Sequence, residues 1–211
     1  MPIISSLLDV DFYKFTMGQL VWKKYPDVPV KYSLVNRTKE ARLADWIDQS
    51  ELLRELEHVR TVRLNKTESH YLRGTNEYGE RMFCEPYLQF LEGLQLPPFQ
   101  LEVADGNFRM EFFGKWSEAI YWETIALSIL NEMYYRAQMQ RLSEFGKDVI
   151  RATGVLRLNQ KFDLLKNRPD ITFCDFGTRR RFSLAWQDYV VGNAFRELPK
   201  QFLGTSNTYL A

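Results

Sequence analysis

One stretch near the carboxyl end constrains the fold of this chain more than any other. Residues 171–174 form a short run of mainly β-favouring residues, which is followed by Gly177 and by three consecutive arginines, Arg179 to Arg181. A short apolar run bounded by turn residues is typical of a buried parallel strand. The sequence therefore predicts a strand that delivers cationic side chains to a loop, as in anion-binding α/β enzymes.

A helix and a second strand are predicted after this loop. Apolar residues recur at helical spacing after Ser183, which is placed to cap the helix. Residues 201–203 predict a strand that ends at residues 204–207. A strand, a helix and a strand within roughly 35 residues form one right-handed crossover. Because ligands bind beyond the carboxyl ends of parallel strands, we expect loops 175–181 and 204–207 to form one pocket.

The amino-terminal region predicts a different architecture. Asp9 or Asp11 is placed to cap a helix over residues 12–24, which ends at Tyr25 because Pro26 cannot continue the hydrogen-bond ladder. Residues 31–37 alternate polar and apolar side chains and predict a strand that ends near Arg37.

Helices and a hairpin follow this strand. Residues 39–73 predict charged packing helices, whose apolar stripe comprises Leu52, Leu53, Leu56 and Val59. Two alternating segments, 99–103 and 108–112, flank Asp105-Gly106-Asn107, the composition of a tight turn with positive φ. A long helix is predicted from Trp116. We therefore expect an α+β domain over residues 1–150 and a separate unit over residues 151–211.

The composition is that of an ordinary globular protein. The 211 residues are 45% hydrophobic, and 28 Lys and Arg stand against 27 Asp and Glu, so net charge gives no sign of a polyanionic partner. Cys84 and Cys174 are far apart, and His58 and His70 lack zinc-ligand spacing, so we expect no structural metal. No apolar run approaches the ~18 residues of a membrane span, and the start of the chain lacks the pattern of a signal peptide. A cytoplasmic location is expected.

Four motifs, in this order along the chain, resemble those of the nicotinate phosphoribosyltransferase family. They are Asp11-Phe12-Tyr13-Lys14-Phe15-Thr16-Met17, Gly114-Lys115-Trp116 followed by Trp122-Glu123, Asp175-Phe176-Gly177-Thr178-Arg179-Arg180-Arg181-Phe182-Ser183, and Gly204-Thr205-Ser206-Asn207. The resemblance spans almost the whole chain. It implies an α/β protein in which an α+β amino-terminal domain precedes an irregular (β/α) barrel.

The resemblance also implies an activity. The family joins nicotinate to phosphoribosyl pyrophosphate, giving nicotinate mononucleotide and pyrophosphate, in a reaction of pyridine-nucleotide salvage that is coupled to ATP hydrolysis and uses magnesium. Members form homodimers that share their active sites. The expected partners are therefore these two substrates and a second subunit, with neither nucleic acid nor membrane.

Substrate-binding residues follow from the motifs. The resemblance implies that Phe176 stacks on one face of the pyridine ring and that Tyr13 of the neighbouring subunit covers the other. Arg179 and Arg180 suit phosphate oxygens because a guanidinium binds them in bidentate fashion. Arg37 is a looser match to an arginine that reaches the phosphoribosyl substrate across the dimer.

The Gly-Thr-Ser-Asn motif adds Thr205 and Ser206 to the predicted substrate site. Where the related nicotinamide enzyme has an aspartate, this chain has Ser206. A carboxylate there would repel the carboxylate of nicotinate, whereas a hydroxyl tolerates it, so Ser206 favours the acid over the amide.

Other interpretations of these residues stay open. A nicotinamide or quinolinate phosphoribosyltransferase would share the fold, the arginine run alone would suit a nucleic-acid-binding module, and a fragment that only dimerises is a further alternative. Asp175-Phe176-Gly177 imitates a kinase motif, but the other kinase motifs are absent from the sequence. Glu123 and Glu132 are interpreted as structural, with Glu132 paired to Arg136 one helical turn on.

The chain is shorter than a complete enzyme of this family is expected to be. A (β/α) barrel takes about 250 residues, whereas only residues 151–211 follow the predicted boundary. The family's phosphorylated histidine lies after the glycine-threonine motif, where neither His58 nor His70 occurs. We therefore expect an incomplete barrel, no assignable catalytic residue, no turnover by these residues alone, and a Gly-Thr-x-x-His-Glu sequence beyond Ala211.

Overall fold

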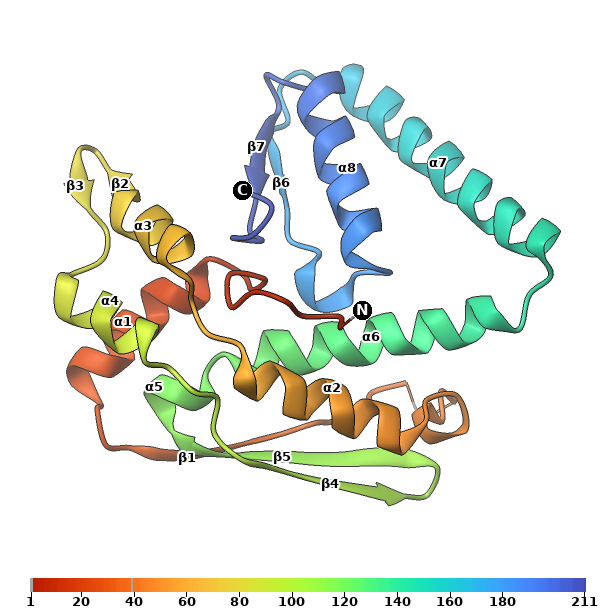
Figure 1. Ribbon diagram of the computed structural model, residues 1–211. Coiled ribbons are helices and arrows are strands. Elements are labelled where there is room, and N and C mark those ends of the chain that lie inside the picture. The colour runs from red at the N-terminus through yellow and green to blue at the C-terminus, as the bar shows by residue number, and fades with distance from the viewer. Residues whose placement is uncertain (1, 39) are drawn as a thin grey trace.

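The computed structural model describes residues 2–38 and 40–211. Met1 and Lys39, which belong to the predicted amino-terminal segment and to the predicted helical stretch 39–73, lie outside the described residues. The central element is helix α6 (Trp122–Gln140). In Figure 1 a three-stranded sheet and helix α2 (Gln49–Thr61) lie on one side of α6, and strands β6 and β7 with helix α8 stand on the other. Because α6 packs against both parts, apolar residues occur on most of its faces.

The three-stranded sheet is antiparallel, in the order β1 (Pro29–Ser33), β5 (Asn107–Lys115) and β4 (Phe99–Ala104). Asp105 and Gly106 join β4 to β5 with φ angles of 53° and 73°, which confirms the predicted hairpin turn. The strand predicted over residues 31–37 instead begins at Pro29 and ends at Ser33, so Arg37 lies in a loop. Phe112 of β5 stacks on Trp122 of α6, with ring centroids 4.6 Å apart.

Short helices complete the larger part of the molecule. They are α1 (Tyr13–Lys24), α3 (Lys66–Gly74), α4 (Glu85–Glu92) and α5 (Trp116–Ala119), with a 3₁₀ turn η1 (Leu43–Asp45) and a small hairpin, β2 (Asn76–Glu77) and β3 (Glu80–Arg81). Leu52, Leu56 and Val59 of α2 are buried as predicted, whereas Leu53 is exposed. One hydrophobic core joins these helices to the sheet and to α6.

Two helix predictions need correction. The long helix predicted from Trp116 is divided at Ile120 and Tyr121, so that α5 and α6 are separate helices. Helix α1 begins after Phe12 and has no side-chain cap, because the carboxylates of Asp9 and Asp11 bind other partners that are described below.

The smaller part contains the predicted crossover unit. Its elements are α7 (Glu144–Lys166), β6 (Phe173–Asp175), a 3₁₀ turn η2 (Thr178–Arg180), α8 (Leu184–Glu197) and β7 (Phe202–Thr205). Strands β6 and β7 are parallel, and the Ser183 hydroxyl caps α8 by accepting from the Trp186 amide at 3.1 Å. Both observations confirm the prediction. The predicted burial of the first strand is wrong, because β7 is the only described strand that pairs with β6, and Cys174 is exposed.

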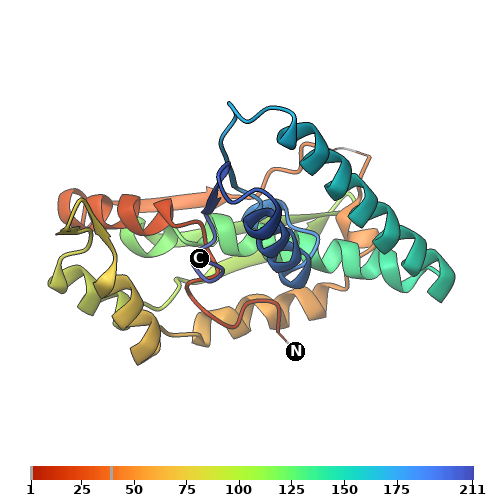
Figure 2. The same ribbon diagram turned by 90° about the horizontal axis from the view of Figure 1, so that it is seen from above.

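Helix α7 leads from the larger part to the smaller one. Figure 2 shows α8 and the two parallel strands above the middle of α6, while α7 runs out to one side. A second, small core of Leu158, Phe162, Ala194, Leu198 and Phe202 joins α7 to α8 and β7. The predicted boundary at residue 150 falls within α7, and the domain limits stay a prediction. Within residues 2–38 and 40–211, no helix is both long enough and apolar enough to cross a membrane.

Candidate functional site

The loops that follow β6 and β7 lie side by side, as the crossover predicted. Asp175 pairs with Thr205 across the two strands, and the Ser206 amide donates to the Asp175 carbonyl at 2.8 Å. The Asp175 carboxylate accepts from the Thr205 hydroxyl at 2.8 Å and from the Gln187 side chain at 2.7 Å. Thr205 and Asp175 therefore fix the two loops to each other, and the Thr205 hydroxyl proton is committed to this contact.

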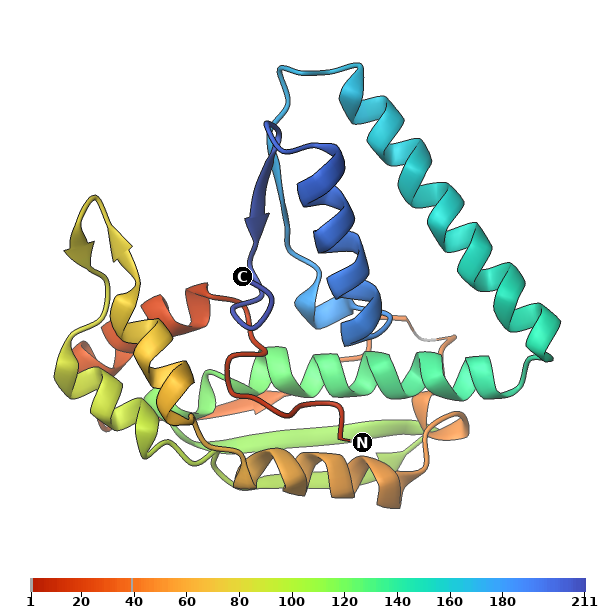
Figure 3. The ribbon, with the colours of Figure 1, turned by 45° about the horizontal axis from the view of Figure 1, so that its top comes forward.

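The amino-terminal segment is bound to the same loops. The Phe12 amide donates to the Ser206 carbonyl at 2.6 Å, and the Thr208 amide donates to the Val10 carbonyl at 3.0 Å. Figure 3 shows this segment passing the end of β7 before it enters α1. These backbone contacts place the first residues of α1 beside the loop that follows β6.

Tyr13 and Phe176 face each other as a result. Their rings are nearly parallel, with an interplanar angle of 16° and a centroid separation of 5.9 Å. Phe176 is 55% exposed, which is unusual for a phenylalanine that only supports a core. The resemblance assigned the opposing tyrosine to a neighbouring subunit, whereas here the Tyr13 that faces Phe176 belongs to the same chain. Burial raises the pKa of the Tyr13 phenol, and nearby Glu123 raises it further, so the phenol is uncharged at neutral pH.

Arg179 lies next to this aromatic pair. Its guanidinium binds Glu123 of α6, and the Asn131 side chain donates to the Arg179 carbonyl at 2.9 Å. The second Glu123 oxygen accepts from Lys14 of α1 at 2.5 Å. Burial raises the pKa of Glu123, but Lys14 and Arg179 together lower it by more, so the carboxylate is charged at neutral pH.

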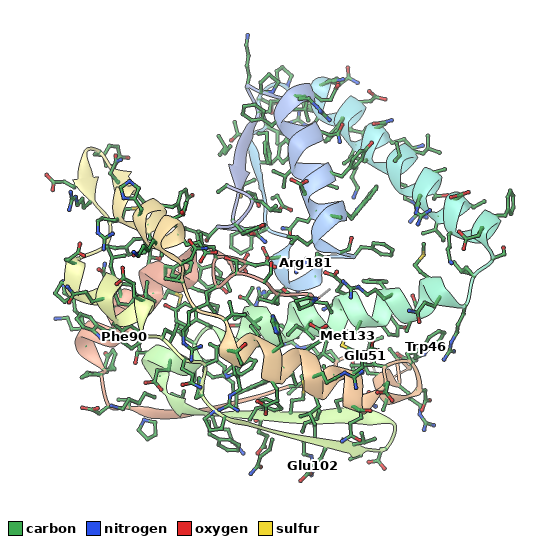
Figure 4. All side chains as sticks on the ribbon, viewed as in Figure 1. Trp46, Glu51, Phe90, Glu102, Met133 and Arg181 are labelled. Atoms are coloured by element: carbon green, nitrogen blue, oxygen red, sulfur yellow. The ribbon has the colours of Figure 1, made fainter. Side chains whose placement is uncertain are left out.

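The three consecutive arginines have three different environments. Arg181 is buried between α6 and the amino-terminal segment (Figure 4), where it binds Asp9 at 2.5 Å and Glu132 at 3.2 Å. Arg180 is exposed, and none of the described residues forms a side-chain ion pair or hydrogen bond with it. Arg181 is therefore a structural residue, and the run does not form a continuous basic surface of the kind that binds nucleic acid.

A cavity of about 940 Å³ opens beside Arg179, between β1, β5, α6 and η2. Its polar lining includes Arg37, Glu123, Asn131, Arg179 and Arg180. The structure thus brings Arg37, Arg179 and Arg180 of one chain to the same cavity. The lining of this cavity does not include Tyr13, Phe176 or Ser206.

Comparison with known families accounts for both parts of this arrangement. Residues 8–131 match the nicotinate phosphoribosyltransferase (NAPRTase) N-terminal domain, and residues 171–211 match the NAPRTase family. The chain belongs to the nicotinate phosphoribosyltransferase family. The first match contains Tyr13, Lys14 and Glu123, and the second contains the arginine turn and the Gly-Thr-Ser-Asn loop.

Solved structures of nicotinate phosphoribosyltransferases have the same fold. The enzyme from Vibrio cholerae matches 100% of this chain at 28% identity, with a TM-score of 0.81. The enzyme from Porphyromonas gingivalis matches 99% of this chain at 26% identity, also with a TM-score of 0.81. The chain covers 49% and 51% of these two proteins, so it spans about half of their length. It corresponds to their amino-terminal portion, and the described residues contain no closed barrel.

Two charged residues that adjoin Tyr13 and Arg179, namely Lys14 and Glu123, were not among the site residues predicted from the sequence. Glu123 was interpreted as structural, and Lys14 was noted only within its motif. Each is a charged residue in an aromatic or apolar helical stretch, and a buried charge in such a position requires a partner of opposite sign. That requirement is the feature by which they could have been found. The interpretation of Glu132 is confirmed, since it binds Arg136 at 2.7 Å.

Magnesium is implied by the family and binds oxygen ligands such as carboxylates. In the part of the chain that the structure describes, no three His, Cys, Asp or Glu side chains are grouped so that they could hold a metal ion. The Asp175 carboxylate, which lies at the loops, already accepts from Thr205 and Gln187. No step of the reaction is therefore assigned to a metal-binding residue of this chain.

Ser206 gives a direct test of how the amino-terminal segment is held. Its hydroxyl donates to Asp11 at 2.7 Å, and the other Asp11 oxygen is buried with no partner in the described part of the molecule. Ser206→Ala removes the one hydrogen bond to a buried carboxylate, so we expect the free energy of unfolding to fall by about 1–3 kcal/mol. Chemical denaturation measures this, with Ser206→Thr as the control that keeps the hydroxyl. Equal stability of the alanine variant and the wild type would contradict the assignment.

Proposed function

We propose that this chain forms the nicotinate-binding and arginine-bearing part of a nicotinate phosphoribosyltransferase. The reaction joins the ring nitrogen of nicotinate to the anomeric carbon of phosphoribosyl pyrophosphate and releases pyrophosphate. The observation that carries the proposal is the parallel pair of Tyr13 and Phe176 beside the Arg179 guanidinium, at the carboxyl ends of two parallel strands. The flat aromatic ring of nicotinate requires aromatic faces on which to stack, and an anionic group requires a cation such as the guanidinium.

The ring slot between Tyr13 and Phe176 has to widen for substrate. The centroids are 5.9 Å apart, whereas a pyridine ring between them requires about 7 Å, twice the contact distance between carbon atoms. Phe176 is more than half exposed and follows the end of a short strand, so its side chain has room to move. Two aromatic faces would then bind the pyridine ring by stacking.

Charge stabilisation accounts for the chemistry in this proposal. Displacement at the anomeric carbon passes through an oxocarbenium-like state, so catalysis depends on positioning and on stabilising the departing pyrophosphate. Arg179, Arg180 and Arg37 adjoin one cavity and would bind phosphate oxygens. Thr205 and Ser206 would shape the floor of the slot through their backbones, because both hydroxyl protons are committed to carboxylates.

Specificity for the acid remains part of the proposal. Ser206 donates its proton to Asp11, so it presents lone pairs and not a donor to a ligand. A preference for nicotinate over nicotinamide would therefore come from the Arg179 charge and from the absence of a carboxylate side chain at position 206.

The remaining parts of the family's activity are also proposals here. We propose that the residues assigned above take no part in coupling to ATP or in supplying the phosphorylated histidine. Magnesium would bind through phosphate oxygens and water. A homodimer and a cytoplasmic location are proposed as well. We further propose that turnover needs the part of the relatives' length that this chain does not span.

The proposal is tested by measuring binding and turnover of the 211-residue protein. Calorimetry should detect binding of nicotinate and of pyrophosphate, whereas mass spectrometry should detect no nicotinate mononucleotide after incubation with nicotinate, phosphoribosyl pyrophosphate, ATP and magnesium. Parallel titrations with nicotinamide and quinolinate separate the related transferases. Absence of nicotinate binding would contradict the assigned site. Formation of the mononucleotide would support the reaction and contradict only the requirement for the remaining length.

A further inference from the structure

A continuous row of three charged side chains joins α1, α6 and η2. It consists of Lys14, Glu123 and Arg179. Glu123 of α6 binds Lys14 of α1 with one carboxylate oxygen, at 2.5 Å, and Arg179 of η2 with the other. The Lys14 side chain is 3% exposed, whereas those of Glu123 and Arg179 are each 32% exposed. One carboxylate therefore serves two cations, one from the interior and one at the rim of the cavity.

Glu123 is fixed in this position by Lys14. In residues 2–38 and 40–211, Glu123 is the only carboxylate that forms an ion pair with the Lys14 ammonium. Moving Glu123 away would leave a buried ammonium without a counter-charge, which is strongly unfavourable. An anionic ligand would therefore bind Arg179 while Glu123 stays bound to the same guanidinium.

The same row adjoins both walls of the aromatic slot. Lys14 follows Tyr13 in α1, and its ammonium lies 5.0 Å from the centroid of the Tyr13 ring. Arg179 follows Phe176 by three residues and lies on turn η2. This turn is bound to α6, because the Thr178 carbonyl accepts from Ser128 and the Arg179 carbonyl accepts from Asn131. Glu123 thus links the element that carries Tyr13 to the element that carries Phe176.

We propose that Glu123 is a positioning residue, which sets the distance between Tyr13 and Phe176 and directs the unpaired edge of Arg179 toward a bound anion. This inference rests on the proposed function. Glu123 contacts Nη1 of Arg179, and the Nε and Nη2 atoms have no hydrogen-bond partner in the portion of the chain that is described. With two cations and one carboxylate the row has a net charge of +1, so it attracts an anion even though Glu123 is negative.

Substitution of Glu123 is expected to lower the affinity for anionic ligands. Glu123→Gln removes the charge that holds Arg179, so we expect pyrophosphate and nicotinate each to bind about tenfold more weakly, the loss of roughly one charge-assisted contact. If Glu123 instead competed with the ligand for Arg179, the same variant would bind more tightly. Calorimetric titration with sodium pyrophosphate and with nicotinate distinguishes the two signs. Glu197→Gln, which removes an exposed carboxylate paired with Lys166, is the matched control.

A second measurement does not depend on any ligand. The Nη1–H resonance of Arg179, assigned by its loss in Arg179→Lys, should be sharp in the wild type, where Glu123 accepts from Nη1, and broadened by exchange in Glu123→Gln. If Glu123→Gln folds poorly, the double variant Lys14→Met/Glu123→Gln removes the stranded ammonium and should still bind weakly. Unchanged or tighter binding by Glu123→Gln, or an unchanged Arg179 resonance, would overturn the inference. If the wild type binds neither probe, the proposed function fails, while the resonance still decides whether Glu123 holds Arg179.

Discussion

Replacing Arg181 with methionine is expected to lower the free energy of unfolding by about 3–5 kcal/mol, the cost of breaking a buried ion pair by removing one partner. The Arg181 side chain is 1% exposed and binds Asp9 and Glu132, whose side chains are 2% and 5% exposed. The guanidinium therefore joins η2 to α6 and to the amino-terminal segment, and Asp9 of that segment also accepts from Asn207, which follows β7. Methionine fills much of the volume but leaves both carboxylates without this partner.

A matched control separates burial from charge in the Arg181 experiment. Arg168 binds Asp170 at 2.6 Å, but both side chains are 61% exposed. Arg168→Met is therefore expected to lower the free energy of unfolding far less than Arg181→Met does, because water screens a surface ion pair. Urea denaturation of both variants provides the comparison. If Arg181→Met were as mild as Arg168→Met, the interpretation of Arg181 as the link between the two parts of the molecule would be wrong.

Replacing Arg179 with alanine should have the largest effect on ligand binding. Its guanidinium is positioned by Glu123 and lies at both the aromatic slot and the cavity. Removing a charge-assisted, bidentate contact is expected to weaken pyrophosphate binding about 100-fold, with stability changed much less than in Arg181→Met. Arg179→Lys keeps the charge but loses the planar fork, so it should recover only part of the affinity.

The control for Arg179 is an arginine of the same region that does not adjoin the site. Arg196 is in the last turn of α8, and its guanidinium contacts Asn193 of the same helix. Arg196→Ala should leave pyrophosphate binding unchanged when both variants are titrated at one ionic strength. Equal affinities of Arg179→Ala and the wild type would show that the anion binds elsewhere.

Local chemistry in the sequence was sufficient to predict several elements of this fold. The turn at Asp105 and Gly106 follows from residues that tolerate positive φ, and the parallel pair of β6 and β7 follows from the spacing of two short strands around one helix. Ser183 caps α8 because its side chain satisfies a free amide at the helix start. Each of these features depends on residues that are close together in the chain.

The features that were not predicted depend on contacts between distant residues. Asp9 and Asp11 could cap α1 as judged from local sequence, but Asn207 and Ser206 bind them across almost the whole chain. Adjacent arginines have identical local sequence character, yet Arg181 is buried while Arg180 is exposed, because α6 and the amino-terminal segment pack on only one side of η2. Such differences follow from tertiary packing, which sequence periodicity does not specify.

The central claim is that one nicotinate molecule binds between Tyr13 and Phe176 of this chain, beside Arg179. Intermolecular nuclear Overhauser effects between the ring protons of nicotinate and those of the protein test this claim most directly, with Tyr13→Leu and Phe176→Leu used to assign the signals. The account predicts contacts from nicotinate to both rings, and the loss of each set in the corresponding variant. Contacts to neither ring, or contacts that persist in both variants, would contradict it.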